Sequence, residues 1–527
     1  MTDLLVENAR VVDGTGAPWF RGAVAVEDGR IAAVRRGEGE GADAARTIDA
    51  DGSIVCPGFV DPHSHSDLMA LEDPLLAPKL RQGITTEVLG QDGFSMAPLR
   101  GDTDEWAEHV SGLAGDADVD WEWSSLGEYL DALEAGGLGP NLATHIGHGT
   151  VRYAVMGMAD RAPEDDELDR MADLVTAGLE DGALGFSTGL VYAPQVNADT
   201  DEVRALAERL APYGRPFVAH IRSEGRWLWS ALDEFVDVGA TAGVPLHLSH
   251  YKVAGAEQHG KAGRANGLLE AARERGIDIT AEAYPYTAGN TVLATVLPPW
   301  VQADSPAAAR ERLADPEARE RIRRDIEGWR IEGWENPALR TGWGNIEVRG
   351  LEANPAYEGR SVAEIAADRD QDPVGAACDL LLAEGLDLSI IAHAMAEPDV
   401  REILDNERVC LCTDGLFGAA PHPRTYGAYP RLLGHYVREE NLLTLEAAVR
   451  KATSLPARAM GLDGKGLLRP GMDADLVVFD PVAVGSPATF AEPTREPRGI
   501  EAVVVSGEVV VRGGDLTGAR PGRALRA

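Results

Sequence analysis

Two histidines, His63 and His65, stand two residues apart just after the apolar segment 58–60. Alternate residues of a strand point the same way, so both imidazoles can reach one metal ion at the end of a strand. The pair alone is a weak signal, because a buried histidine often serves only as a hydrogen-bonded core residue. It becomes informative together with the other metal-capable side chains of the chain.

Three more metal-capable side chains also end apolar segments. His220 and His250 each close a short strand pattern, and Asp414 closes the segment 408–414. In an α/β barrel the carboxyl ends of the strands meet on one face, where barrel enzymes place their sites. We therefore predict a divalent metal centre on that face. Four other histidines are expected to pack in the core or to support the ligands: His145, His148, His247 and His393.

The middle of the chain alternates helix and strand patterns. A capped helix start, an apolar stripe and a stop at Gly214 precede the strand pattern 216–220, and the cycle recurs towards 244–250 and 277–284. Repeated βα units predict a parallel sheet, and their number favours a closed barrel. Candidate strands for the eight places of a barrel end at His65, Asp92, His148, Ser187, His220, His250, Tyr284, His393 and Asp414.

One of these candidate strands is in excess. The stretch 287–386 is partly polar and rich in Arg, Glu and Pro, so we expect it to contain an insertion that takes one neighbouring strand. Both ends of the chain instead show short, Val-rich β-patterns, which predict one satellite domain built by the two termini. The predicted organisation is a β-domain from residues 1–56 and 466–527, and a barrel from residues 57–465.

Composition limits the function classes. The 527 residues are 44% hydrophobic and 26% charged, which is typical of a globular protein. A formal net charge of −37 disfavours binding to nucleic acid or to an anionic membrane. A high-salt source or a GC-rich genome would each explain this acidic excess. With few cysteines (Cys56, Cys378, Cys410 and Cys412), no signal peptide pattern and no apolar run of about 18 residues, we expect a cytoplasmic location.

Together these motifs resemble the amidohydrolase superfamily and, more closely, the D-aminoacylase (N-acyl-D-amino-acid deacylase) family. The resemblance covers nearly the full length. It implies a distorted TIM (β/α)8 barrel with a small β-sandwich formed by both chain ends, in agreement with the pattern of elements. It rests on the His63/His65 segment and on the segments 83–86, 90–93, 182–190, 220–225, 249–252, 413–415, 422–424 and 466–480.

Asp92 departs from the pattern of that family. Its members typically place a metal-binding Cys in an Asn-Cys-Gly turn, where this chain has Gln91-Asp92-Gly93. A carboxylate is a harder ligand than a thiolate, so the preference for Zn²⁺ over Mn²⁺ or Co²⁺ should be weaker. Many amidohydrolases bridge two metals with a carboxylated Lys, but no Lys occurs between Lys79 and Lys252. Asp92 is the expected bridge; the alternative is an acid that only supports the ligands.

The resemblance implies an enzyme that removes the acyl group from N-acyl-D-amino acids by attack of metal-bound hydroxide. Asp414 would act as the general base and return the proton to the departing amine. One or two divalent ions, Zn²⁺ first, would be held by His63, His65, Asp92, His220, His250 and Asp414.

The substrate is expected to be a small molecule with a free carboxylate, so binding it needs a cation. Lys252 is the first candidate, Arg222 and Arg424 are further ones, and Tyr284 is a plausible donor nearby. A cyclic-amide hydrolase of the dihydroorotase or hydantoinase type stays open, because residue types do not separate ring amides from open ones. A non-catalytic assembly protein on the same fold is disfavoured by the retained ligands. The preference for the D enantiomer comes from the resemblance alone.

Overall fold

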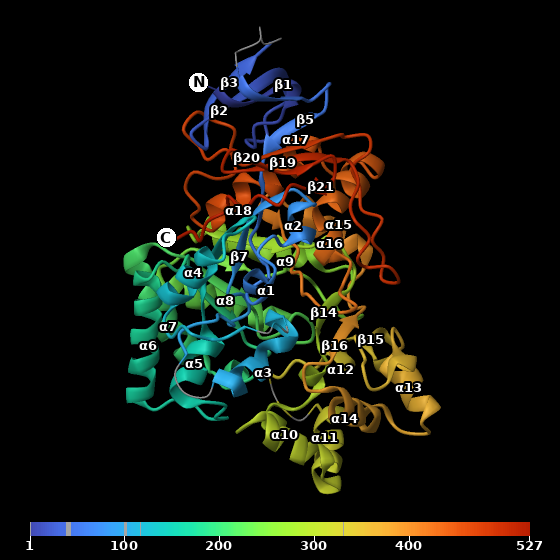
Figure 1. The fold of residues 1–527 in the computed structure, drawn as a ribbon. Helices are drawn as coiled ribbons and strands as arrows, with labels where there is room; N and C mark the ends of the chain where they lie inside the picture. Colours follow the sequence, from blue (N-terminus) through green and yellow to red (C-terminus); the bar gives the residue numbers. More distant parts are fainter. Residues whose placement is uncertain are drawn as a thin grey trace.

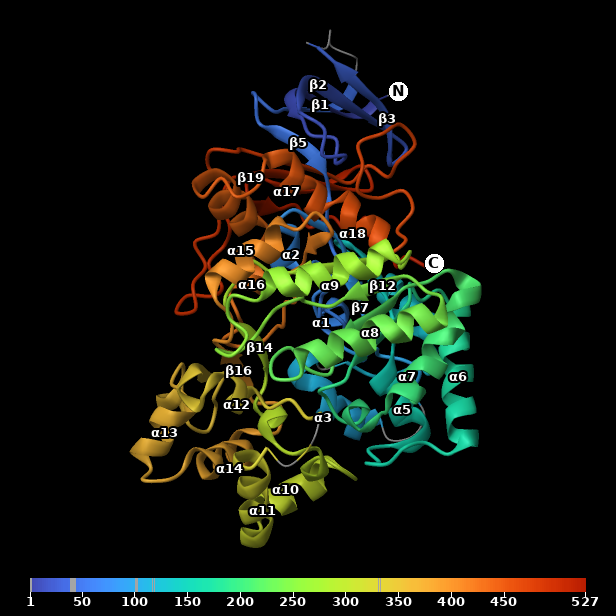
Figure 2. The same cartoon turned by 180° about the vertical axis from the view of Figure 1, so that it is seen from behind.

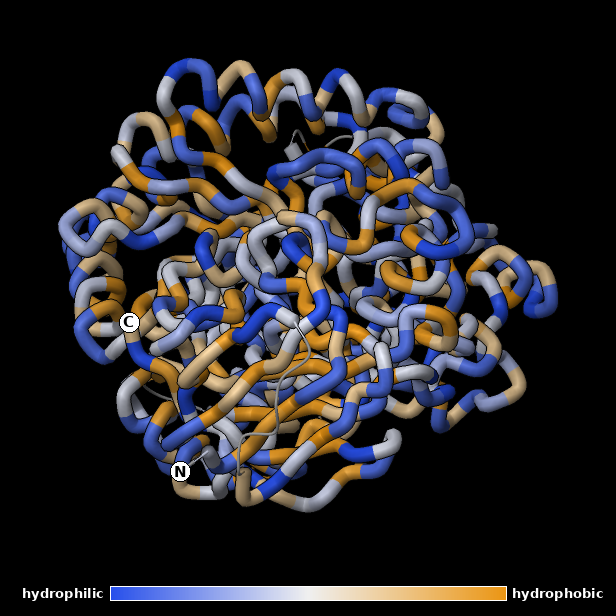
Figure 3. The backbone as a smooth tube through the Cα atoms, turned by 90° about the horizontal axis from the view of Figure 1, so that it is seen from above, coloured by the Kyte–Doolittle hydropathy of each residue, from blue (hydrophilic) through white to orange (hydrophobic). Residues whose placement is uncertain are grey.

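The structure is a computed structural model that describes residues 2–37, 44–99, 103–115, 117, 119–329, 331 and 333–527. Figures 1 and 2 show three parts: a β-rich part around the N-terminus, a central α/β body, and a lobe of helices at the opposite end. Seen from above in Figure 3, the outer helices alternate between hydrophilic and hydrophobic residues. This alternation is what helices packed on a core by one face require.

The β-rich part is one sheet built from both ends of the chain. Its strand order is β21-β20-β19-β18-β5-β1-β2-β3, with β4 paired to β1. Leu4 and Val24 from the first end share one apolar cluster with Leu476 and Val504 from the second. The strands are β1 (Thr2–Val11), β2 (Phe20–Glu27), β3 (Arg30–Arg36), β4 (Ala44–Asp49), β5 (Ile54–Pro57), β18 (Leu476–Phe479), β19 (Ile500–Val505), β20 (Glu508–Arg512) and β21 (Asp515–Leu516).

The central body is the predicted parallel barrel. Its strands pair in the orders β6-β7-β8 and β9-β10-β11-β12-β13-β17, and only His145 separates β8 from β9. A parallel bridge between Ser64 and Gly415 closes the ring between the first and last strands. The strands are β6 (Phe59–Asp61), β7 (Ile84–Leu89), β8 (Asn141–Thr144), β9 (Ile146–Gly147), β10 (Phe186–Gly189), β11 (Phe217–His220), β12 (Leu246–Leu248), β13 (Ile279–Ala283) and β17 (Val409–Leu411).

Helices surround this barrel and follow the start and stop signals of the sequence. In α7, for example, the side chain of Asp199 accepts a hydrogen bond from the Glu202 backbone nitrogen. The helical segment that continues α7 ends at Gly214, which adopts the left-handed conformation that glycine favours. Around the barrel lie α1 (Met69–Glu72), α2 (Ala77–Leu80), α3 (Thr103–Ala114), α4 (Leu126–Ala135), α5 (His148–Met156), α6 (Asp165–Glu180), α7 (Thr200–Ala207), α8 (Leu228–Ala242), α9 (Ala262–Glu274), α15 (Glu397–Asp405), α16 (Arg424–Arg431), α17 (Leu445–Ala452) and α18 (Ser454–Ala459).

An inserted lobe interrupts the barrel between β13 and β17. It has its own apolar cluster, which includes Leu293, Ile346 and Ile390. The excess candidate strand, just before His393, is β16 of this lobe, so the lobe extends beyond the predicted limit at residue 386. The lobe contains an antiparallel sheet of β14 (Gly289–Val292), β16 (Ser389–Ala392) and β15 (Ile346–Arg349), with α10 (Pro306–Ala314), α11 (Pro316–Glu327), α12 (Pro337–Thr341), α13 (Val362–Asp368) and α14 (Pro373–Glu384).

A buried ion cluster sits at the seam where the barrel closes. Lys79 Nζ donates to Asp61 Oδ2 at 3.0 Å, to Ser64 Oγ at 2.6 Å and to Thr413 Oγ1 at 2.9 Å. It also lies 3.0 Å from Glu87 Oε2. Lys79 therefore ties the first strand to the last one, directly beneath the segments that carry His63, His65 and Asp414. Among the described residues, no helix is both long and apolar enough to span a bilayer.

Lys79→Met should destabilise the fold strongly. Removing the cation leaves two buried carboxylates without their partner, which costs about 3–5 kcal/mol. We expect a clear fall in the apparent melting temperature measured by calorimetry. The matched control is Arg273→Met, which breaks the exposed pair with Glu270 and should lower the melting temperature much less, because solvent screens an exposed ion pair. Equal effects of the two substitutions would show that the seam does not depend on Lys79.

Candidate metal centre

All six predicted ligands come together at the carboxyl ends of the barrel strands. His63 and His65 follow β6, Asp92 follows β7, and His220 is the last residue of β11. His250 follows β12, and Asp414 follows β17. Three overlapping groups have ligand atoms close enough to hold a metal ion: His63 with Asp92 and His250, His63 with His65 and Asp414, and His220 with Glu224 and His250.

Asp92 lies in the middle of this cluster. Its Oδ1 is 3.3 Å from His250 Nε2 and 3.6 Å from His63 Nε2, and its Oδ2 is 3.7 Å from His220 Nδ1. On the other side, Asp414 Oδ1 lies 3.4 Å from His65 Nε2 and 3.7 Å from His63 Nε2. Asp92 thus contacts both histidine pairs, which is the position of a bridging ligand.

The donor set fits a divalent cation. Asp92 Oδ1 and His220 Nδ1 are buried and have no hydrogen-bond partner among the described residues. A buried polar atom without a partner is costly, unless an ion or a ligand compensates it. Imidazole nitrogens and carboxylate oxygens are the donors that zinc and neighbouring transition metals accept. The cluster therefore has the geometry of a metal centre and donor atoms that lack a partner within the described protein.

The backbone is strained at three of the six ligands. Asp92, His250 and Asp414 have φ values of 53°, 30° and 48°, in the left-handed region that residues other than glycine rarely occupy. Gln195 holds one of these turns, because its Nε2 donates to Asp92 O at 2.7 Å. Such strain costs on the order of 1–3 kcal/mol per residue and is typical of functional sites. Sequence patterns carry no signal for it.

Two glutamates that the sequence analysis missed orient the histidines. Glu282 Oε1 lies 2.7 Å from His63 Nδ1, and its other oxygen contacts His247 Nε2. Glu224 Oε1 lies 3.0 Å from His250 Nδ1. A carboxylate on one ring nitrogen leaves the other nitrogen free to face the metal. The signal that could have revealed Glu282 is its place inside the otherwise apolar strand β13.

The charges of the cluster reinforce one another. Burial raises the pKa of Asp92, but His250 and His63 outweigh it and hold the pKa well below its ordinary value. Burial and Lys252 lower the pKa of His250, yet Asp92 and Glu224 raise it to about 10. Burial also opposes ionisation of Asp414, and Arg424 outweighs it, so the pKa of Asp414 is lowered. The carboxylates are therefore ionised at neutral pH, and His250 has to release its proton when it binds a metal cation.

Three of the four predicted substrate-binding residues share a hollow with the metal cluster. This hollow contains about 680 Å³ of space that atoms do not fill, open solvent included, and is lined by Lys252, Tyr284 and Arg424. Arg424 is fully buried, lies 2.7 Å from Asp414 Oδ2, and stacks over the Tyr284 ring at 4.4 Å. Lys252 Nζ lies 2.5 Å from Glu224 Oε1 and 2.7 Å from His250 Nδ1.

The structure does not bring Arg222 to this hollow. Its guanidinium pairs with Glu234 at 3.0 Å and faces a different hollow, beside Trp300 and Trp334. The inserted lobe supplies a cation that sequence reasoning missed. Arg340 lines the hollow of the metal cluster and lies 3.3 Å from Glu335 Oε1. The other predicted supporting histidines lie outside the ligand set, with His148 on Glu202 at 2.8 Å and His393 on Glu347 at 3.0 Å.

Comparisons with known proteins agree with this geometry. The profile of the "Amidohydrolase family" matches residues 46–511. The chain is 35% identical to D-aminoacylase from Alcaligenes xylosoxydans xylosoxydans, over 99% of this chain and 97% of the relative. It is 38% identical to N-acyl-D-glutamate deacylase from the same organism, over 99% of this chain and 96% of the relative.

A solved structure gives the same result in three dimensions. N-acyl-D-glutamate deacylase from Bordetella bronchiseptica, in complex with zinc and a phosphonate that mimics the tetrahedral intermediate, superposes with a TM-score of 0.84. The two chains are 34% identical, and the match covers 100% of each. The chain therefore belongs to the amidohydrolase family and, within it, to the D-aminoacylase group.

Proposed function

We propose that this protein is a metal-dependent deacylase that hydrolyses the amide bond of N-acyl-D-amino acids. One observation carries the proposal: five of the six predicted ligands line the same hollow as Arg424, a buried cation that lies 2.7 Å from Asp414 Oδ2. Hydrolysis of such a substrate needs a metal, a proton carrier and a carboxylate receptor within one small space. Full-length relatives with deacylase activity support this choice over a cyclic-amide hydrolase.

The histidines and the two aspartates would hold one or two divalent ions, with zinc the first candidate. A divalent ion in such a site lowers the pKa of a water molecule and polarises the carbonyl under attack. The protein supplies the remaining functions. Glu282 and Glu224 fix the ring orientations of His63 and His250, and burial excludes bulk water from the cluster.

Asp414 is placed to move the proton. Its Oδ1 faces His63 and His65, whereas its Oδ2 is held by Arg424. The guanidinium keeps Asp414 ionised, so the carboxylate can accept a proton from the attacking water and deliver it to the departing nitrogen. Without that second transfer the amine would be a poor leaving group.

Arg424 is also the best placed receptor for the substrate carboxylate. Its Nε is buried without a hydrogen-bond partner among the described residues. Both cations already have partners: Arg424 contacts Asp414 and the carbonyl oxygen of Asn290, and Lys252 contacts Glu224 and His250. A guanidinium can bind a carboxylate through two parallel hydrogen bonds, which an ammonium cannot reproduce. Lys252 and Tyr284 complete the lining on that side of the hollow.

Asp414→Asn should abolish most of the activity but keep the fold. The substitution is nearly isosteric and removes the proton acceptor, so kcat should fall on the order of 10²–10⁴-fold. Steady-state kinetics with an N-acetyl-D-amino acid, together with metal analysis of the purified variant, checks this. Activity within a few-fold of the wild type would remove Asp414 from the mechanism.

Arg424→Lys should weaken recognition of the substrate carboxylate more than Lys252→Met does. The measurement is the ratio of kcat/KM for an N-acyl-D-amino acid to kcat/KM for the matching N-acyl amine, which lacks the carboxylate. We expect this ratio to fall about ten-fold or more in Arg424→Lys, because the bidentate contact is lost. If the ratio falls further in Lys252→Met, Lys252 is the main receptor instead.

Asp92→Ala should weaken metal retention, whereas Asp92→Cys should preserve it and shift the preference towards Zn²⁺. The alanine variant loses an anionic ligand that both histidine pairs face, and the thiolate replaces it with a softer one. Metal analysis after dialysis against a weak chelator checks both expectations. Asp399→Asn is the control, since Asp399 is a buried acid outside the cluster. Wild-type metal content in Asp92→Ala would make Asp92 a supporting residue only.

A further inference from the structure

A second hollow adjoins the one that contains the metal cluster. The space that atoms do not fill, open solvent included, is about 670 Å³ in the second and about 680 Å³ in the first. Four residues line both of them: Leu113, Val191, Tyr192 and Thr295. We call the second one the lobe hollow, because it lies between the barrel loops and the inserted lobe.

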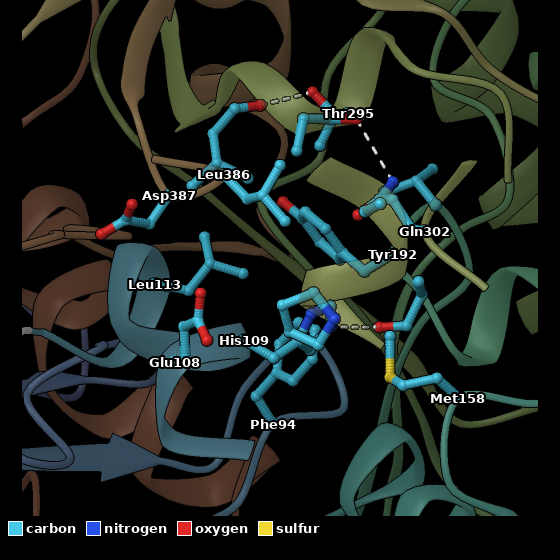
Figure 4. Close-up of a pocket in the computed structure, with 16 residues that line it drawn as sticks. Phe94, Glu108, His109, Leu113, Met158, Tyr192, Thr295, Gln302, Leu386 and Asp387 are labelled. Atoms are coloured by element: carbon cyan, nitrogen blue, oxygen red, sulfur yellow. Dashed lines mark hydrogen bonds between the residues drawn. The ribbon is translucent and has the colours of Figure 1, made fainter. Parts of the chain in front are cut away.

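The walls of the lobe hollow are mainly apolar. Phe94 and Met158 come from the barrel side, and Val292, Ala309 and Leu386 come from the inserted lobe. Figure 4 shows Tyr192 and His109 in the middle, with Phe94 and Leu113 on the side of α3 and Thr295 and Gln302 on the side of the lobe. Such a surface favours an aliphatic group, which gains free energy on leaving water.

No cation lines the lobe hollow in the part of the chain that the structure describes. Its lining includes Glu108, which pairs with Arg310, and Asp387, but no Lys or Arg. His109 Nε2 lies 2.8 Å from Ala193 O, and burial lowers the pKa of His109, so the ring is neutral at pH 7. The carboxylate end of a substrate is therefore expected on the side of Arg424, and an uncharged part of it in the lobe hollow.

The proposed reaction decides which uncharged part that is. The departing nitrogen has to reach Asp414, and the Cα attached to it has to place its carboxylate near Arg424. The acyl group lies on the other side of the scissile bond. Tyr192 marks that side, because its ring packs edge-on against His220 at 5.4 Å between centroids. The Tyr192 hydroxyl lies 3.1 Å from Thr291 Oγ1 in the inserted lobe, which fixes the ring at the boundary between the hollows.

We propose that the lobe hollow binds the acyl chain of the substrate, and that the protein prefers aliphatic acyl groups longer than acetyl. This inference rests on the proposed deacylase function and adds the substrate class. Tyr192 is the specificity-determining residue at the entrance, and the apolar side chains of the lobe supply the binding surface. The kcat/KM should rise on the order of four-fold for each methylene group that enters the hollow.

The test uses the metal-loaded full-length protein and a series of N-acyl-D-amino acids that differ only in acyl length, from acetyl to octanoyl. Ala309→Phe fills the lobe hollow from α10, outside the lining of the metal hollow. Ala307→Phe is the matched control, because Ala307 is exposed on the same helix. We expect the octanoyl-to-acetyl ratio of kcat/KM to fall at least ten-fold in Ala309→Phe and to stay at the wild-type value in Ala307→Phe.

A binding measurement on a second variant tests the acyl-chain assignment without turnover, and it does not depend on correct folding of Ala309→Phe. Octanoate, the product carboxylic acid, should bind the wild type with its chain in the lobe hollow and its carboxylate beside the metal cluster, and titration calorimetry should show a negative heat-capacity change. Leu386→Gln places a polar group in the hollow with little change in volume, and octanoate should bind it at least five-fold more weakly.

The outcomes separate this inference from the proposed function. A wild type that hydrolyses the acetyl substrate without preferring longer chains would overturn the acyl-chain assignment and leave the deacylase function intact. A preference for octanoyl that survives both Ala309→Phe and Leu386→Gln would overturn it as well. A wild type that hydrolyses no substrate of the series would refute the deacylase function itself.

Discussion

The carboxylate of Asp92, shared between the two histidine pairs, is the contact on which the centre depends. Four imidazoles that face one another without an anion would repel when protonated, and would leave buried nitrogens unpaired when neutral. Asp92 offers both oxygens to them at 3.3–3.8 Å. Gln195 holds its backbone in a left-handed turn, and Gly93 follows in the same conformation. A Cβ on Gly93 would overlap the Gln195 side chain, so this turn admits no larger residue there.

The predicted ligands could be chosen from the sequence because the alternation of side chains along a strand shows which residues point the same way. His63 and His65, His220, His250 and Asp414 all follow short apolar segments, and the topology of a parallel barrel brings such positions to one face. The same reasoning also predicted that the two ends of the chain build one small β-domain. These conclusions need only the pattern of each segment and the general geometry of the fold.

The site residues that the sequence analysis did not identify take their roles from contacts between distant segments, and no local sequence pattern encodes such contacts. Glu224 and Glu282 act through ring nitrogens that only the assembled barrel places beside them. Arg222 follows His220 closely in the sequence but leaves the strand end towards Glu234, whereas Arg424 reaches Asp414 from the start of α16. Arg340 belongs to the inserted lobe, and Tyr192 is held in place by its hydrogen bond to Thr291 of that lobe. The excess strand also looked like a barrel strand until its antiparallel partners were known.

The closure of the barrel by its first and last strands has a consequence for biosynthesis. The centre joins ligands that are hundreds of residues apart in the chain, and Lys79 bonds to Thr413 across the same seam. A ribosome adds residues in order, so the amino-terminal histidines emerge long before their partner Asp414 does. The strand β5 likewise has only β1 as a neighbour until β18 has been synthesised, because β5 lies between β1 and β18 in the sheet. The group of His63, His65 and Asp414 is therefore assembled only after β17 has been synthesised, whereas the other two groups use residues up to His250 and emerge much earlier.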